Sequence, residues 1–214
     1  MNRTHRILRA LTAVAIALAL TAGTAAAAAY SVSLAGGAGL PTSDYGDLYQ
    51  TGWNLGGSGD YQFNELLGIG VDLGYDSSNA KSDYEAALAA VAITFFGAPP
   101  GMTIDDKITA LHYGVHATGR PPMVGPVHPY AQFGVAGYSL KEKIDASDPT
   151  YSGDISKTLF GVNGGVGVDF TAAPTMSLGV AGLYHWINAK NDFGANATWF
   201  SLQGKVTFHI PLAK

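Results

Sequence analysis

The chain has 214 residues, of which 47% are hydrophobic and only 13% are charged, and this length suits one domain of ordinary size. Twelve Lys and Arg residues stand against sixteen Asp and Glu, and an acidic chain is a poor partner for nucleic acid, so no nucleic-acid binding is expected. The chain contains no cysteine, which excludes disulfides, thiolate zinc sites and cysteine nucleophiles.

The first 29 residues have the organisation of a secretory signal peptide. Three arginines precede a short apolar core (11–20), and an A-x-A sequence ends at Ala29. The apolar core is too short to cross a bilayer of ~30 Å as a helix. We therefore expect a cleaved signal peptide over 1–29 and one further domain over 30–214.

From residue 30 onward the sequence alternates with the period of two that is typical of a β-strand. In LGIGVDLGY (67–75) every second residue is large, while the residues between are glycine or aspartate. GVNGGVGVDF (161–170) follows the same rule. Successive side chains of a strand point to opposite faces, so each segment presents one apolar face and one small or polar face. The glycines of 161–170 do not have the spacing of a dinucleotide-binding loop, and no βαβ unit follows, so no nucleotide site is expected.

This alternation recurs eight times. We predict strands at 30–40, 49–63, 66–77, 107–119, 129–143, 157–171, 176–188 and 197–210. These strands are longer than the usual strand of a soluble sheet and match the ~9–11 residues with which a tilted strand crosses a bilayer. Long alternating strands, an even count and a signal peptide together predict an all-β fold, an eight-stranded antiparallel transmembrane β-barrel of the bacterial outer membrane.

The connections between the predicted strands alternate in length. Those after the second, fourth and sixth strands are mostly short, and those after the odd strands are longer and polar. Outer-membrane barrels have short periplasmic turns and longer outer loops, so both ends of the domain are predicted on the periplasmic side. The longest connection (78–106) contains an apolar run (86–96) that is too short to span the membrane. We expect this run to form a short helix or a hairpin extension above the membrane, folded over the barrel mouth.

Eight strands leave an interior just wide enough for side chains to fill, or for one small ligand. The inward face of the alternation carries glycine together with polar and charged residues. We predict a polar network in the lumen that consists of Asp60, Asp72, Asn163, Asp169 and Lys205. Lys205 is the expected partner of Asp169.

The outward face carries aromatic residues near the predicted strand ends. These are Tyr61, Phe63, Tyr75, Phe170, Tyr184, Trp186, Phe200 and Phe208. Rings of this kind gather at the two interfaces of a membrane, so we predict that they form aromatic girdles.

The histidines offer the remaining candidates for chemistry. His112 and His116 share one face of a predicted strand, but at ~3.3 Å per residue they stand about 13 Å apart, which favours lumen polar residues over a metal site. His185 invites comparison with lipid-modifying barrel esterases, which carry a serine two positions after their histidine; here that position is Ile187. No catalytic, metal or cofactor site is predicted.

Three segments resemble a known group of proteins. HPYAQFGVAGYSL (128–140), GVNGGVGVDF (161–170) and YHWINA (184–189) are similar, in this order, to strands of small eight-stranded outer-membrane barrels. This group includes the OmpW-like, OmpX-like and opacity-type porin families and the OmpA transmembrane domain. One departure is the end of the chain, which reads PLAK (211–214) where the group usually ends on an aromatic residue.

The resemblance implies a location in the outer membrane of a Gram-negative-type bacterium. It implies outer-membrane lipid, including lipopolysaccharide, as a partner, and the barrel-assembly machinery and periplasmic chaperones as partners during export. It leaves three functions open: a non-enzymatic barrel that supports envelope integrity or surface interaction through its outer loops, a narrow passive channel for small apolar molecules, and a lipid-modifying enzyme. We favour the first, because a passage for apolar molecules needs an apolar lining and the predicted lumen is polar and rich in glycine.

Overall fold

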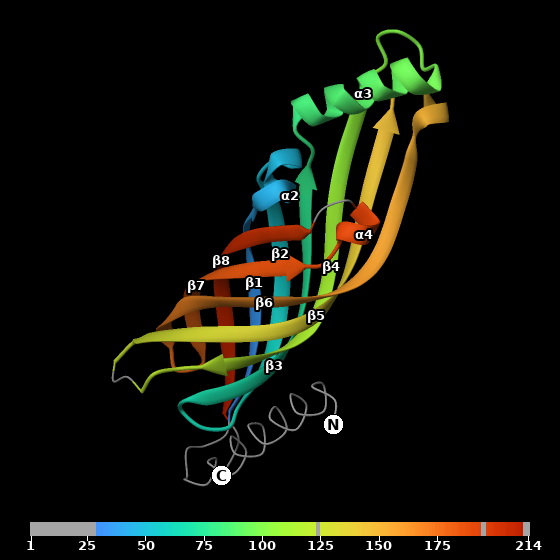
Figure 1. The fold of residues 1–214 in the computed structure, drawn as a ribbon. Coiled ribbons are helices and arrows are strands. Elements are labelled where there is room, and N and C mark those ends of the chain that lie inside the picture. The colour runs from blue at the N-terminus through green and yellow to red at the C-terminus, as the bar shows by residue number, and fades with distance from the viewer. Residues whose placement is uncertain (1–28, 123–124, 194–195, 212–214) are drawn as a thin grey trace, which may run out of the picture.

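The computed structural model describes residues 29–122, 125–193 and 196–211, and these form a closed antiparallel β-barrel (Figure 1). The strands are β1 (Ala29–Pro41), β2 (Gly52–Gln62), β3 (Leu67–Asn79), β4 (Ile104–Gly119), β5 (Val127–Ala146), β6 (Gly153–Ala173), β7 (Met176–Ile187) and β8 (Ala197–Pro211). The predicted fold class and the eight strands are confirmed. The predicted signal peptide lies outside the described residues, apart from Ala29 at the start of β1.

Each strand pairs with its neighbours in the sequence, and the barrel closes where β8 pairs with β1. The closing ladder runs from Ala29 opposite Pro211 to Pro41 opposite Trp199 without interruption. Closure gives the backbone groups of both strands a partner, which hydrocarbon surroundings demand. The two described ends of the chain consequently lie side by side.

Three neighbouring strands extend beyond the rest of the barrel at one end. β4, β5 and β6 contain 16, 20 and 21 residues, and Figure 1 shows them rising past the other five. We call their far parts (104–110, 139–146 and 153–159) the outer extension. Each of these strands is longer than the sequence predicts, because antiparallel pairing continues into the polar segments beyond the predicted strand ends.

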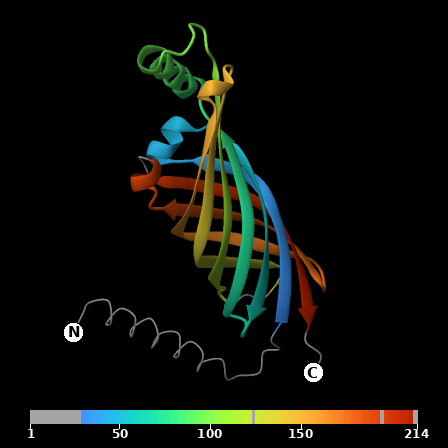
Figure 2. The ribbon, with the colours of Figure 1, turned by 90° about the vertical axis from the view of Figure 1, so that its right-hand side faces the viewer.

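The apolar run 86–96 of the longest connection is helical. A short helix was one of the two structures expected for it. Helix α3 (Ser82–Phe96) lies across the far end of the outer extension, which the two ribbon views show from different sides (Figures 1 and 2). Its Ala89 and Ala92 pack with Ile104 of β4 and with Ile144 of β5. The helix ends at Gly97, whose φ of 72° is the left-handed conformation that glycine adopts most easily.

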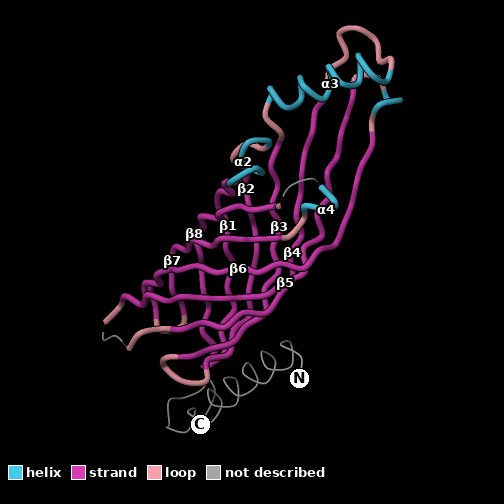
Figure 3. Tube along the Cα trace, in the orientation of Figure 1, coloured by secondary structure: helices cyan, strands magenta, loops and turns pink. Residues whose placement is uncertain are grey.

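Helix α3 packs on the outer extension through Ala89 and Ala92, and its Tyr84 packs against the buried cluster at the barrel mouth. A shorter helix also contributes to closing the mouth. Helix α2 (Ser43–Leu48) places Tyr45 in the buried cluster at this end of the interior, and Tyr49 follows it. Helix α4 (Lys190–Phe193) and the 3-10 turn η1 (Pro149–Tyr151) belong to the same end, so the helices gather at one end of the strands (Figure 3). Within the described ranges, no helix is long and apolar enough to cross a membrane.

The outer surface of the barrel carries a belt of exposed apolar side chains. Leu34, Leu55, Val71, Phe133 and Val166 are each about 60% exposed. A belt of this size has no counterpart on ordinary soluble proteins and matches the apolar band of a barrel in a bilayer.

The aromatic residues predicted for the girdles all lie on this outer surface, in two groups. Tyr61, Phe63, Phe170 and Phe208 lie toward the short turns, and Tyr75, Tyr184, Trp186 and Phe200 lie toward the helices. Their position at the two membrane interfaces stays a prediction.

Glycines on the inner face make room for particular polar side chains. A Cβ atom added to Gly70 would lie 2.6 Å from both Asp60 Oδ1 and His116 Nε2. A Cβ atom on Gly167 would meet the phenol of Tyr130. The inner glycines thus set where the large polar residues of the lumen lie.

Candidate functional site: the barrel interior and the outer mouth

The barrel interior has two zones along its length. A polar zone surrounds a cavity of ≈ 70 Å³ whose wall includes Asp60, Asp72, His116 and Lys205. An apolar zone of buried aromatic and aliphatic side chains lies at the helical end. The predicted network residues belong to the inner face of the barrel.

Asp169 and Lys205 form an ion pair in the polar zone. Lys205 Nζ lies 3.0 Å from Asp169 Oδ1 and donates a hydrogen bond to Tyr130 Oη at 2.9 Å. Arg120 Nη2 lies 3.6 Å from Asp169 Oδ2. Asp169 is only 2% exposed, and a carboxylate buried so deeply needs compensating cations and donors.

Asp60 and Asp72 are brought together by a histidine between them. His116 Nε2 lies 2.7 Å from Asp60 Oδ1, and His116 Nδ1 lies 3.0 Å from Asp72 Oδ1. The series continues through His112, whose Nδ1 lies 3.3 Å from Asp76 Oδ2. Carboxylates of β2 and β3 therefore alternate with imidazoles of β4. His116 can donate to both of its carboxylate partners only when both of its nitrogens carry a proton.

Asn163 belongs to a third group of contacts. Its Nδ2 donates to Tyr138 Oη at 3.3 Å, and this hydroxyl lies 3.0 Å from His185 Nδ1. The structure thus divides the five predicted residues among three local groups: Asp169 with Lys205, Asp60 with Asp72, and Asn163.

Three residues that contact these groups, Tyr138, Tyr130 and Arg120, are not among the predicted network residues. Tyr138 is fully buried on the inner face, whereas Phe133 and Val135 of the same strand point outward. The alternation in β5 places Tyr138 on the inner face only if Phe133 is first assigned to the outer face. Tyr130 and Arg120 gave no signal, because their role depends on which strands meet Lys205.

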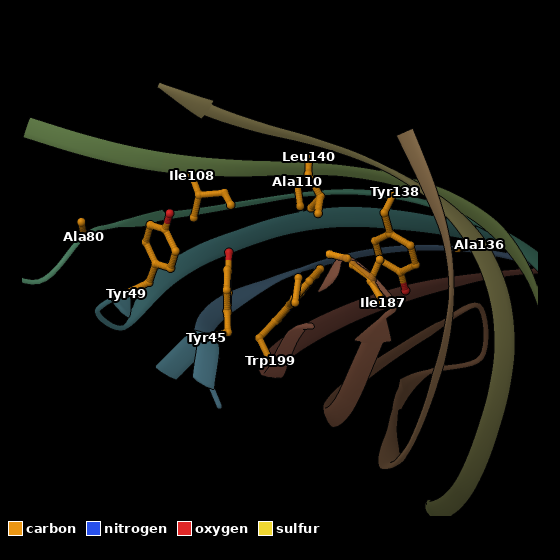
Figure 4. Close-up of a cluster of buried hydrophobic side chains, with 12 residues drawn as sticks. Tyr45, Tyr49, Ala80, Ile108, Ala110, Ala136, Tyr138, Leu140, Ile187 and Trp199 are labelled. Atoms are coloured by element: carbon orange, nitrogen blue, oxygen red, sulfur yellow. The ribbon is translucent and has the colours of Figure 1, made fainter. Parts of the chain in front are cut away.

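The apolar zone closes the interior at the helical end. Figure 4 shows Tyr45 and Tyr49 side by side, with Trp199, Ile187 and Tyr138 farther along the cluster. The rings of Tyr45 and Tyr49 lie 4.8 Å apart. At the boundary with the polar zone, the Trp199 ring stacks on His185 at 4.8 Å, and its Nε1 donates to Asp76 Oδ1 at 3.1 Å.

Two carboxyl groups meet beside this zone, in the outer extension. Tyr49 Oη lies 3.3 Å from Asp106 Oδ2 and 3.4 Å from Glu142 Oε1. The single hydroxyl proton of this phenol is therefore shared between the two carboxyl groups. Glu85 of α3 accepts a hydrogen bond from the Asp106 backbone N–H at 3.1 Å. Burial, together with the nearby Glu142 charge, raises the pKa of Asp106 to about 7, and burial also raises the pKa of Glu142.

The sequence matches the model of one protein family. This family is described as the outer membrane protein beta-barrel domain, and the match covers residues 12–208. No curated protein matches the chain.

Solved structures with the same fold come from several bacteria. OprG of Pseudomonas aeruginosa is 14% identical and has a TM-score of 0.55, with 89% of this chain and 99% of that chain covered. A major outer membrane protein of Thermus thermophilus is 15% identical (TM-score 0.53; 86% and 100% covered). Neisserial surface protein A is 17% identical (TM-score 0.51; 86% and 99% covered). At these identities the likeness shows the fold alone.

Replacing Lys205 by methionine should leave Asp169 buried with Arg120 as its remaining cation. We expect Lys205→Met to lower the free energy of unfolding by about 2–4 kcal/mol, measured by urea unfolding of the barrel in detergent micelles. Lys157→Met is the matched control, because Lys157 pairs with Asp192 at the surface and such pairs contribute at most ~1 kcal/mol. Equal losses in the two variants would contradict an internal role for Lys205.

The raised pKa of Asp106 predicts a stability that depends on pH. The folded chain holds the Asp106 proton more tightly than the unfolded chain, so this residue lowers stability as the pH rises from about 4 to about 7. Asp106→Asn should remove this decline, gaining roughly 1–3 kcal/mol at pH 8 relative to pH 4. Melting temperatures at the two pH values test this, with the exposed Asp145→Asn as a control that keeps the wild-type decline.

Proposed function

Because the chain belongs to the outer-membrane protein β-barrel domain family, we propose that it is a non-enzymatic outer-membrane protein that acts at the cell surface through its outer extension. The observation that carries this proposal is the filled interior. The polar zone retains a cavity of ≈ 70 Å³, which is room for a few water molecules. The apolar zone closes the helical end with Tyr45, Tyr138 and Trp199.

The outer extension has the properties of a platform for contacts outside the membrane. Its three strands are paired along their length, and α3 lies across their far end (Figure 2). Phe95 and Phe96, at the end of α3, are 77% and 70% exposed. Exposed apolar side chains on a helix that packs against paired strands form a surface suited to binding a partner. Outer-membrane lipid, including lipopolysaccharide, and the assembly machinery remain proposed partners.

A passage for small apolar molecules is the second candidate. The apolar zone at the helical end favours it, since an apolar solute could enter among Tyr45, Ile108 and Leu140. The same solute would then meet the ion pairs of Asp169 and His116, which disfavour apolar cargo. We therefore rank the passage below the surface role.

An enzymatic role has the weakest support. His185 is the residue that we compared with the histidine of barrel esterases. It is 1% exposed, and its Nδ1 lies within hydrogen-bond distance of Tyr138 Oη. Ser177 Oγ lies 2.8 Å from His209 Nε2, but Ser177 is 3% exposed on the inner face, and we assign this pair a structural role.

Planar-bilayer recordings separate the surface role from the passage. We expect the refolded barrel to show no discrete conductance steps, with or without an apolar solute in the bath, because the interior is filled. Trp199→Ala combined with Tyr138→Ala opens the apolar zone but leaves the ion pairs of the polar zone in place, so this variant should also show no conductance steps. Solute-dependent events in the wild-type barrel would favour the passage.

Proteolysis of intact cells tests the orientation of the outer extension. Chymotrypsin should cut after Phe95 or Phe96, because these exposed residues lie at the end of a short helix outside the membrane. Cutting after Leu66, an exposed residue in the short turn at the opposite end, should occur only after the outer membrane is permeabilised. Cutting at 95–96 only in permeabilised cells would contradict the proposed orientation.

A further inference from the structure

A second small cavity lies at the outer mouth, between α2, α3 and the outer extension. Its volume is ≈ 60 Å³. It is lined by Tyr45, Leu48, Tyr49, Tyr84, Ile108, Leu140, Glu142 and Ala197. Tyr84 and Glu142 are partly exposed, so the cavity is within reach of the outer medium.

Three tyrosine rings form the aromatic part of this wall. The rings of Tyr45 and Tyr49 are 4.8 Å apart and tilted, and those of Tyr49 and Tyr84 are 6.3 Å apart and nearly edge to face. The faces of such rings carry negative potential, which attracts cations that are not strongly hydrated.

The negative charge beside these rings lacks a counterion in the described part of the chain. Glu142 lines the cavity, and Tyr49 connects it to Asp106, which is 2% exposed. Among the described residues, neither acid takes part in an ion pair, and Asp106 Oδ1 is buried without a hydrogen-bond donor. Glu142 is the carboxylate that lines the cavity, so a cation in this space would lie beside a carboxylate that has no ion-pair partner among the described residues.

We propose that this cavity binds a small organic ammonium ion of the tetramethylammonium or choline type. The methyl groups contact the rings of Tyr45, Tyr49 and Tyr84, and the positive charge lies near Glu142. One water needs ~10–15 Å³ of such volume, so ≈ 60 Å³ accommodates about four to six small non-hydrogen atoms, which is the size of a trimethylammonium group.

The donor set suits an organic cation better than a metal ion. A single carboxylate lines the cavity, whereas hard cations such as Ca²⁺ need six or more oxygen ligands. Across the described ranges, no group of three or more His, Cys, Asp or Glu side chains is arranged to hold a metal ion. The site goes beyond the proposed surface role, because it takes a small molecule whether or not α3 binds a macromolecule.

Titration of the refolded full barrel in maltoside micelles tests the proposal without a competing choline headgroup. Tetramethylammonium chloride should change the tryptophan fluorescence, because the ring centre of Trp199 lies 6.3 Å from that of Tyr45 in the cavity wall. We expect a Kd between about 0.1 and 10 mM. Sodium chloride at equal concentration controls for ionic strength. Choline and its neutral isostere 3,3-dimethylbutan-1-ol form the second comparison, and the neutral compound should bind at least about tenfold more weakly.

Two variants locate the site. Glu142→Gln and Tyr84→Leu should each weaken tetramethylammonium binding at least about fivefold, and both residues are partly exposed, so the barrel should still fold. Asp145→Asn and Tyr151→Leu are matched controls in the same outer region that should leave binding unchanged. Heat-shifted gel mobility verifies folding of every variant.

The proposal is overturned by any of three results: no saturable response up to about 50 mM, equal affinity for the neutral isostere, or wild-type affinity in both site variants. These results are independent of conductance and of chymotrypsin access at 95–96. Failure of the cation site is therefore distinguishable from failure of the surface role.

Discussion

A barrel that closes at eight strands has to be filled by its own side chains, and the rest of this structure follows from that constraint. The space inside is so narrow that each large inward residue needs a small one opposite. Gly70 lies against the Asp60–His116 contact, and Gly167 lies against Tyr130. The glycine-rich stretch GVNGGVGVDF is therefore a strand whose small inward residues leave space for large side chains of neighbouring strands. Its Asp169 is one of the charged residues that fill the interior.

Charged side chains fill the middle of the barrel interior, and aromatic rings fill the mouth. With both parts filled, the interior leaves little room for a solute, so we look for function outside the lumen. Buried carboxylates are tolerated in the polar zone because lysine, arginine and histidine lie beside them. At the mouth the situation is reversed, since Asp106 and Glu142 share only the phenol of Tyr49. The paired charges of the polar zone are the ones that the Lys205 variant tests for a role in stability, and Glu142 at the mouth is the carboxylate on which the proposed cation site depends.

The sequence predicted the barrel well because alternation is a local property. In 67–75 the inner and outer faces can be assigned from nine letters, without knowing which strand lies next to which. Contacts across the interior are different, because Lys205 reaches Asp169 and Tyr130 only through the register of several strand pairs. The lengths of β4, β5 and β6 were underestimated for another reason: beyond the exposed apolar belt their backbone pairing continues, although the outward side chains there are polar. Tyr45 lies outside the predicted strands. Tyr49 begins the predicted strand 49–63, whereas β2 begins at Gly52 and Tyr49 is buried in the cluster at the mouth.

The outer extension rises from only three adjacent strands, and this makes the molecule directional within the plane of the membrane. A neighbour that approaches from the side of β4, β5 and β6 meets a tall wall of paired backbone topped by α3. A neighbour that approaches from the side of β8 and β1 meets the low rim, where α2 and α4 are the highest elements. In a crowded membrane, rotation about the barrel axis therefore decides which of two different surfaces an adjacent molecule contacts.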